Sequence, residues 1–189
     1  MSADRPPRTA RARTLFLGSG VFAVPILEAL VTAPNIELAG VVSAPDRRSG
    51  RRAELTPVPV ARRAREMGLP LLQPVRVRSP EAIAAISGLR PDLAVLADYG
   101  QIIPPTVLAI PPHGILNVHP SALPRHRGAS PIAATIAAGD PAATVTLIQM
   151  DEGLDSGPVV ASESWPIKRI SGFIKNNNIG VFIDHPGNE

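Results

Sequence analysis

The sequence predicts an α/β fold built on an open, mostly parallel, twisted sheet with helices on both faces. The order of apolar runs and helical stretches predicts this class. Short apolar runs, typical of buried strands, alternate along the chain with stretches of helical periodicity. Crossovers between such strands are right-handed and make consecutive strands parallel. A length of 189 residues suits a single domain with a sizeable core.

Strands are expected wherever a short apolar run is bounded by turn residues. The expected strands cover residues 14–17, 38–42, 69–72, 93–96, 115–118, 144–150 and 159–163. Helices are expected over residues 21–31, 58–67, 105–108 and 130–138, the last ended by Gly139. A further helix starts at Ser79-Pro80, with the serine as N-cap and proline in the first turn. Residues 45–57 are expected to form a polar, arginine-rich loop.

Composition excludes several classes of protein. The chain has no cysteine, which excludes disulfides, a thiol nucleophile and a thiolate metal site, and which fits the cytoplasm. No apolar run reaches about 18 residues, so no membrane span is expected. The formal charge is only +3, but arginines cluster in the leader and again at Arg47, Arg48, Arg51 and Arg52. Such clusters favour a polyanion such as RNA, with a simply solvated surface as the alternative.

The two ends of the chain differ from its middle. Residues 1–13 form a basic leader without the apolar core of a signal peptide, and are expected to be disordered. Both lysines, Lys168 and Lys175, lie in the last 22 residues, where arginine and alanine nearly vanish. We therefore expect a domain over residues 14–167 and an atypical tail, foreign to it, over residues 168–189.

A glycine motif follows the first expected strand. Gly18-x-Gly20-x-x-Ala23 matches the turn that binds a dinucleotide pyrophosphate, and Asp46 lies near the place of the ribose-binding acid. This motif keeps a nicotinamide-dependent oxidoreductase open as an alternative. The same glycines also serve any tight turn from strand to helix.

Asn117 and His119 form the strongest constellation. Side chains two apart on a strand share a face, and these two lie at the strand's carboxyl end, where open α/β sheets place ligands. Pro120 and Pro124 stiffen the loop that follows. A catalytic role is therefore favoured over a structural one. A nucleophilic pair of Ser121 with His119 is possible, but no nucleophile elbow surrounds the serine.

An acidic turn, residues 150–158, lies between two expected strands. Asp151 and Glu152 fit solvated turn charges, whereas Asp155 is better placed to enter a site. A carboxylate beside a histidine favours the charged imidazole and fixes its orientation. The spacing of these groups does not fit a metal site.

Taken together, these motifs resemble the folate-dependent formyltransferases, and most closely the branch that formylates methionyl-tRNA. The resemblance spans residues 14–167 and rests on several motifs in fixed order. They are Phe16-Leu-Gly-Ser-Gly, Pro45-Asp-Arg-Arg-Ser-Gly-Arg51, Leu55-Thr-Pro-Val-Pro, Leu72-Gln-Pro74, Tyr99-Gly-Gln-Ile-Ile-Pro104, Asn117-x-His119, Arg125-His-Arg-Gly-Ala-Ser-Pro131, Ala138-Gly-Asp140 and Gln149-Met-Asp-Glu-Gly-Leu-Asp155.

The resemblance implies a Rossmann-like formyltransferase fold and a direct transfer reaction. The donor is 10-formyltetrahydrofolate, the acceptor is the α-amine of methionyl-initiator tRNA, and neither a metal nor a covalent intermediate is needed. Asn117 and His119 would stabilise the developing oxyanion, with Asp155 assisting. The folate-contacting loop is Ser121, Ala122, Leu123 and Pro124; the tRNA-contacting arginines are Arg47, Arg48, Arg51 and Arg52. A cytoplasmic monomer is expected.

Departures from the family pattern leave alternatives open. Ala122 stands in place of the usual leucine, and Asp98 in place of a small apolar residue. The C-terminal tRNA-binding domain of the family is expected to be absent. The alternatives are therefore a formyltransferase for another amine, such as glycinamide ribonucleotide or an amino sugar, and a crippled folate-binding remnant.

Overall fold

The computed structural model describes residues 11–49, 54–168 and 182–183. Residues 1–10 of the leader, Arg51, Arg52 and most of the tail lie outside the described residues. The chain forms two compact units, residues 1–117 and residues 118–189. In the described part of the chain, no helix is long and apolar enough to cross a membrane.

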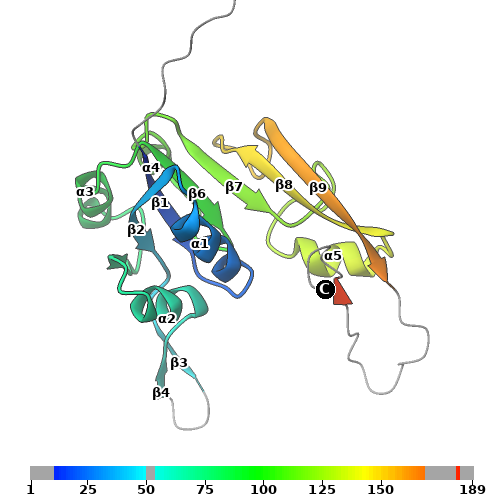
Figure 1. The fold of residues 1–189 in the computed structure, drawn as a ribbon, viewed down its shortest axis with the longest axis horizontal. Helices are drawn as coiled ribbons and strands as arrows, with labels where there is room; N and C mark the ends of the chain where they lie inside the picture. Colours follow the sequence, from blue (N-terminus) through cyan, green and yellow to red (C-terminus); the bar gives the residue numbers. More distant parts are fainter. Residues whose placement is uncertain (1–10, 50–53, 169–181, 184–189) are drawn as a thin grey trace, which may run out of the picture. The chain divides into compact units, whose positions relative to one another are not determined.

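The first unit is built on a parallel sheet (Figure 1). Its strands are β1 (Ala12–Gly18), β2 (Ile36–Val42), β5 (Leu71–Leu72), β6 (Leu93–Ala97) and β7 (Ile115–His119). The last two residues of β7, Val118 and His119, belong to the second unit. Hydrogen bonding gives the order β5-β2-β1-β6-β7, parallel throughout. The predicted fold class is confirmed. These strands are apolar runs because a parallel sheet is covered on both faces.

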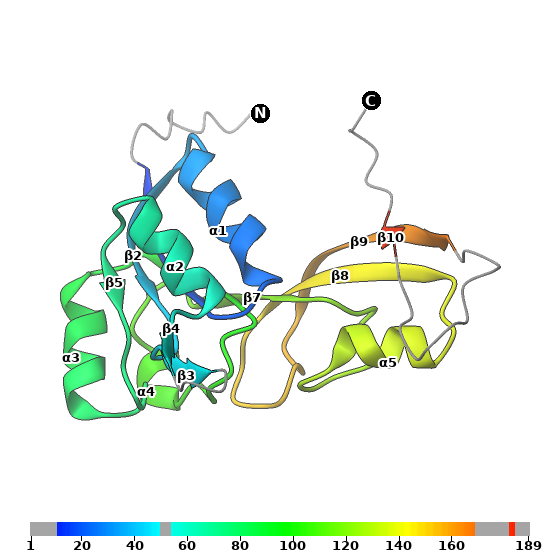
Figure 2. The ribbon, with the colours of Figure 1, turned by 90° about the horizontal axis from the view of Figure 1, so that it is seen from below.

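Four helices connect these strands. They are α1 (Ala23–Thr32), α2 (Pro59–Glu66), α3 (Pro80–Gly88) and α4 (Pro105–Leu108). The chain runs from β1 outward to β5 and then returns to β6 and β7 on the other side of β1. Right-handed crossovers therefore place α1 and α2 on one face and α3 and α4 on the other. Helices α1 and α2 contact each other, as Figure 2 shows.

The core of this unit surrounds β1. Leu15, Phe16 and Leu17 are essentially unexposed, as are Val41 and Val42 of β2. The predicted start of α3 is confirmed, because the Ala82 amide donates to the Ser79 hydroxyl over 3.2 Å.

Strand β1 starts at Ala12, two residues earlier than the leader boundary that the sequence predicted. Arg13 holds this start of the strand in place through its backbone and side-chain contacts, although its side chain stays 39% exposed. Its amide donates to the Asp92 carboxylate over 2.8 Å. Its guanidinium donates to the Leu89 carbonyl over 3.0 Å and pairs with Glu37.

The predicted loop 45–57 contains an antiparallel hairpin, which corrects the expectation. Its strands are β3 (Arg47–Ser49) and β4 (Glu54–Thr56), with Arg47 opposite Thr56 and Arg48 opposite Leu55. The described side chains of the hairpin are exposed. It therefore lacks the alternation of apolar and polar residues that reveals a strand in sequence.

The second unit is built on the antiparallel pair β8 (Ala142–Gln149) and β9 (Val159–Lys168), with β10 (Phe182–Ile183) beside β9. Helix α5 (Pro131–Ala137) precedes β8. Strand β9 is five residues longer than the predicted 159–163. Its extra length comes from pairing, since Trp165 lies opposite Ala143 and Pro166 opposite Ala142.

Candidate active site

Three of the predicted site residues belong to one strand and one turn. Burial alternates along β7, so that Asn117 is 6% exposed and His119 is 5% exposed. Asn117 belongs to the first unit and His119 to the second, so each is described with its own unit. In the first unit, Asn117 lies opposite Leu96, at the carboxyl end of the parallel strands.

His119 contacts two oxygen atoms within the second unit. Its Nε2–H donates to the His126 carbonyl over 3.1 Å, and its Nδ1 lies 3.6 Å from the Asp155 Oδ2 atom. The second distance is that of an ion pair rather than of a hydrogen bond. Because a carbonyl only accepts, Nε2 carries a proton.

The structure distinguishes between the two aspartates of the acidic turn. Asp155 has φ of 47° and turns its carboxylate toward His119, where Oδ2 also accepts from the Gly128 amide over 2.8 Å. Asp151 instead closes its own turn, accepting from the Gly153 amide and the Ser156 hydroxyl. The structure thus brings His119 and Asp155 together and leaves Asp151 apart.

Ser121 braces the loop after β7. The side chain is completely buried, its hydroxyl donates to the Arg125 carbonyl over 2.7 Å, and its own carbonyl accepts from the Thr146 hydroxyl over 2.6 Å. The structure therefore contradicts the nucleophilic pair of Ser121 and His119, since both groups are bonded elsewhere. Of the other predicted folate-contacting residues, Ala122 and Leu123 are half-buried and Pro124 is exposed.

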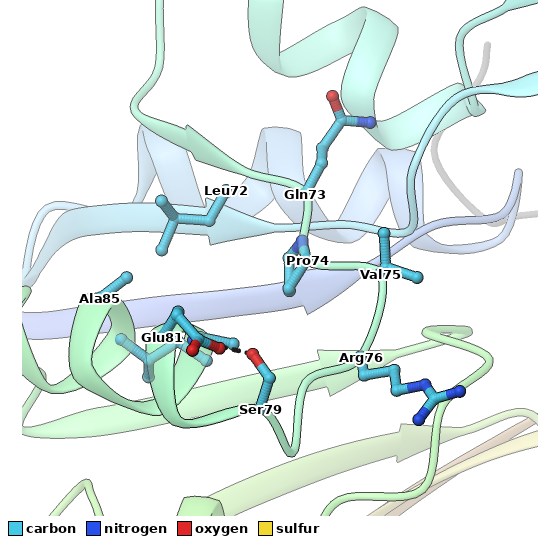
Figure 3. Close-up of a pocket in the computed structure, with 10 residues that line it drawn as sticks. Leu72, Gln73, Pro74, Val75, Arg76, Ser79, Glu81 and Ala85 are labelled. Atoms are coloured by element: carbon cyan, nitrogen blue, oxygen red, sulfur yellow. Dashed lines mark hydrogen bonds between the residues drawn. The ribbon is translucent and has the colours of Figure 1, made fainter.

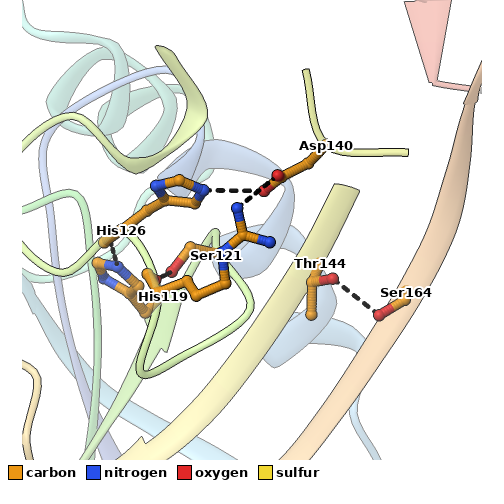
Figure 4. A network of polar contacts seen from close by, with 7 residues as sticks. His119, Ser121, His126, Asp140, Thr144 and Ser164 are labelled. Atoms are coloured by element: carbon orange, nitrogen blue, oxygen red, sulfur yellow. Dashed lines mark hydrogen bonds and ion pairs between the residues drawn. The ribbon is translucent and has the colours of Figure 1, made fainter. Parts of the chain in front are cut away.

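Sequence reasoning gave no role to two residues close to this histidine, His126 and Asp140, although both lie in motifs of the family resemblance. His126 supplies the carbonyl that accepts from His119, and its own ring donates to Asp140 over 2.8 Å (Figure 4). Asp140 lies in the connection from α5 to β8, and in the sequence it belongs to the motif Ala138-Gly-Asp140 of the resemblance, to which no role was given. No local pattern could have shown that a side chain 14 residues away anchors the loop.

A model of the formyl transferase family matches residues 12–171. The chain belongs to this family. It is 49% identical over 155 residues to a methionyl-tRNA formyltransferase of Rhizorhabdus wittichii, covering 82% of this chain and 50% of that protein. A methionyl-tRNA formyltransferase of Dehalococcoides mccartyi is 47% identical over 156 residues, with the same coverages. The chain thus spans about half the length of these relatives.

Solved structures of other formyltransferases share the fold. The phosphoribosylglycinamide formyltransferase of Anaplasma phagocytophilum has a TM-score of 0.68 and 26% identity, over 84% of this chain and 74% of that one. The glycinamide ribonucleotide transformylase 1 of Geobacillus kaustophilus has a TM-score of 0.64 and 28% identity, over 84% of both chains.

The amides of the glycine turn are already bonded within the chain itself. The amides of Ser19 and Gly20, which would bind a pyrophosphate, donate to the Asp98 carbonyl over 3.0 and 3.2 Å. The Asp98 carboxylate lies against Gly20, where an added Cβ would collide with it. Partial burial raises the pKa of Asp98 above its ordinary value. The turn therefore disfavours the nicotinamide cofactor of the rival interpretation.

Asp46 holds the arginine hairpin rather than a ribose. Its Oδ1 accepts from the Gln73 amide over 2.7 Å and its Oδ2 from Arg65 over 3.0 Å. The Gln73 hydrogen bond is the largest cause that lowers the pKa of Asp46 below its ordinary 3.8. Gln73 also donates to the Ala44 carbonyl over 2.8 Å, and so ties the base of the hairpin to β5.

This network predicts a pH-dependent stability. A carboxyl group whose pKa is lower in the folded chain than in the unfolded chain stabilises the fold when the pH is above the unfolded pKa. This stabilisation is lost as the pH falls through the folded pKa. Gln73→Ala should lower the free energy of unfolding by about 1–3 kcal/mol at pH 7. That difference should shrink below about pH 4. Denaturant unfolding across pH 3–7 measures it.

Gln101→Ala is the matched control for this experiment. Gln101 accepts from the Val77 amide and donates to the Pro74 carbonyl, with no carboxylate in the network. Its effect should not change over the same pH range. If the loss of unfolding free energy in Gln73→Ala were equally independent of pH, the charge on Asp46 would not be involved.

The arginines predicted to contact RNA are only partly described. Arg47 and Arg48 lie on β3 and are exposed, whereas Arg51 and Arg52 lie outside the described residues. An exposed hairpin that presents cationic side chains suits phosphate contacts, which position a nucleic acid without reading its sequence.

A cavity of about 470 Å³ opens between the end of β5 and helix α3 (Figure 3). Its lining is largely apolar, with Gln73, Arg76 and Glu81 among its polar side chains. None of the predicted site residues lines it. Among the described residues, no group of three histidine, aspartate or glutamate side chains is arranged to hold a metal ion.

Proposed function

We propose that this chain transfers a formyl group from 10-formyltetrahydrofolate to the α-amine of methionyl-initiator tRNA, as a cytoplasmic monomer without a metal. The observation that carries the proposal is the pairing of His119 with Asp155 at the end of β7, over 3.6 Å. It occurs in a chain 49% identical to a methionyl-tRNA formyltransferase. That protein's name supplies the acceptor.

The reaction is an acyl transfer between two nitrogens. The amine attacks the formyl carbon, a new carbon–nitrogen bond forms, and charge develops on the formyl oxygen. The Asn117 amide and an N–H at His119 Nδ1, the ring nitrogen that the His126 carbonyl does not use, are suitable donors to that oxygen. The intermediate then releases the folate nitrogen, which takes up the proton that the amine loses, with Asp155 assisting the transfer.

In the proposed reaction, the two ring nitrogens of His119 have different tasks, which their contacts support. Nε2–H is engaged by the His126 carbonyl, which fixes the plane of the ring. Nδ1, held only at ion-pair distance from Asp155, is the nitrogen that can exchange its proton. Contacts of this kind are often long without substrate and tighten in the reacting complex.

The loop after His119 would form one wall of the folate site. Ala122, Leu123 and Pro124 present apolar groups, which suit the face of an aromatic heterocycle. The Ser121 hydroxyl is used inside the loop, so it would shape this wall rather than contact the donor.

The hairpin arginines Arg47 and Arg48, with Arg51 and Arg52, would contact tRNA phosphates. Arg47→Ala with Arg48→Ala should raise KM for the tRNA about 10-fold, leave kcat nearly unchanged and weaken the salt dependence of binding. Arg62→Ala with Arg78→Ala removes the same charge from exposed arginines outside the hairpin. Equal KM values for the two double variants would contradict a specific role of the hairpin.

The proposed acceptor is tested against its alternatives by steady-state assays with a single donor. Methionyl-initiator tRNA, glycinamide ribonucleotide and an amino sugar are offered with 10-formyltetrahydrofolate, and a donor-binding titration runs in parallel. We expect kcat/KM to be highest for the tRNA. A preference for another amine would change the acceptor, and donor binding without turnover would make the chain a folate-binding remnant.

A further inference from the structure

One short segment, Arg125–Gly128, holds both members of the proposed catalytic pair. The His126 carbonyl accepts from His119 Nε2–H over 3.1 Å. Two residues on, the Gly128 amide donates to Asp155 over 2.8 Å. The orientation of the histidine and of its carboxylate therefore depends on where this segment lies.

The backbone of the segment needs an external anchor. His126 has φ of 56°, a left-handed conformation that a residue with a β-carbon disfavours. Its carbonyl points at His119 only while this conformation lasts. The Ser121 hydroxyl donates to the Arg125 carbonyl and so fixes the residue before His126. This hydrogen bond does not fix the side chain of His126.

Asp140 is the anchor. Its Oδ2 accepts from His126 Nε2–H over 2.8 Å and its Oδ1 from the Arg125 guanidinium over 2.7 Å. Figure 4 shows the ring of His126 turned toward Asp140, with His119 next to the His126 backbone. The Asp140 side chain is 10% exposed and the His126 side chain 15% exposed, so water competes little for their contact.

Asp140 itself is fixed by the end of α5. Its amide donates to the Thr135 carbonyl over 3.2 Å, directly after Gly139 in a left-handed conformation. The carboxylate thus connects a helix end to the segment Arg125–Gly128. His126 is the largest cause that lowers the pKa of Asp140 below its ordinary value, which keeps this anchor charged at neutral pH.

We propose that Asp140 is a positioning residue for His119, acting through His126: its carboxylate holds the His126 ring and so keeps the His126 carbonyl on the catalytic imidazole. This inference rests on the proposed function for its catalytic consequence. It assigns no contact of Asp140 with either substrate.

The test combines kinetics with a direct observation of the His119 ring. Asp140→Ala and His126→Ala should lower kcat by about 10-fold to 100-fold while KM for both substrates stays within about 2-fold. In proton NMR, each should lose or shift the Nε2–H resonance of His119, which is assigned by its absence from His119→Gln. Because the two residues act in series, the double variant should be no slower than the worse single one.

Three further variants separate positioning from plain stabilisation. His126→Gln places an amide donor near the position of Nε2 and should restore most of kcat. Asp140→Asn keeps the shape and should lie between wild type and Asp140→Ala. Thr144→Val removes the hydroxyl pair of Thr144 with Ser164, 2.8 Å long, from the same unit and should change neither kcat nor the ring resonance.

A folded Asp140→Ala or Asp140→Asn protein with the wild-type ring resonance and kcat would overturn the inference, as would strictly additive losses in the double variant. If Asp140→Ala does not fold, His126→Ala against His126→Gln gives the same decision. If the wild-type chain transfers no formyl group at all, the proposed function fails, but the ring resonance still shows whether Asp140 positions His119.

Discussion

Single replacements of the three proposed catalytic residues should abolish most formyl transfer without loss of the fold. Asn117→Ala, His119→Ala and Asp155→Asn are each expected to lower kcat by about 10²–10⁴-fold. The physical reason is that charge develops on the formyl oxygen only in the transition state. Donors to that oxygen, and the carboxylate beside the imidazole, therefore stabilise the transition state more than the bound substrates.

The structure offers a close control for this experiment. Asp151→Asn alters a carboxylate in the same turn as Asp155, but one that accepts from Gly153 and Ser156 rather than facing His119. It should keep near-wild-type kcat. Donor affinity, from a folate titration, should be similar in all four variants. If any of the three proposed catalytic variants retained a large part of wild-type kcat, the role assigned to that residue would be wrong.

Gly157→Ala should disrupt the turn that carries Asp155. Gly157 is buried, and an added Cβ would collide with the backbone carbonyl of Gln149, which no side-chain rotation can relieve. The neighbouring hydrogen bond from the Gln149 amide to the Pro158 carbonyl, 2.9 Å long, would have to shift with it. We expect a loss of about 2–3 kcal/mol in the free energy of unfolding. Because Asp155 lies two residues before the glycine, kcat should fall as well.

Gly153→Ala is the matched substitution in the same turn. There the nearest atom to an added Cβ is the Ser156 hydroxyl, which can rotate away. Its cost should therefore be smaller in a thermal or denaturant unfolding experiment. Equal losses for the two variants would show that the Gln149 carbonyl is not the source of the destabilisation.

The parallel sheet could be predicted because strands that are buried on both faces must be continuous apolar runs. Phe16 in β1 and Val95 in β6 are buried among apolar neighbours, and such runs stand out in sequence. The hairpin β3–β4 could not be predicted, because its exposed Arg47, Arg48 and Leu55 need no apolar face. The contacts that hold it are the pairing of β3 with β4 and those of Asp46 at its base, and these join residues that are not neighbours in the sequence.

In the candidate site, too, some residues could be predicted from local pattern and others could not. Strand periodicity alone predicts that Asn117 and His119 share one face of β7. Spacing could not choose between Asp151 and Asp155, because the choice depends on which carboxylate reaches His119 after the chain has turned back. Nor could it find Asp140, whose effect passes through the backbone of His126.

The account depends most directly on whether the formyl carbon moves to the amine on this chain. Wild-type protein in excess over methionyl-initiator tRNA is mixed with 10-formyltetrahydrofolate labelled with ¹³C in the formyl group, and the tRNA-bound methionine is examined by mass spectrometry over a single turnover. The account predicts labelled N-formylmethionine with the wild-type chain and almost none with His119→Ala, although both bind the donor. Unlabelled methionine after incubation with a donor-saturated wild-type chain, or equal labelling by His119→Ala, would contradict it.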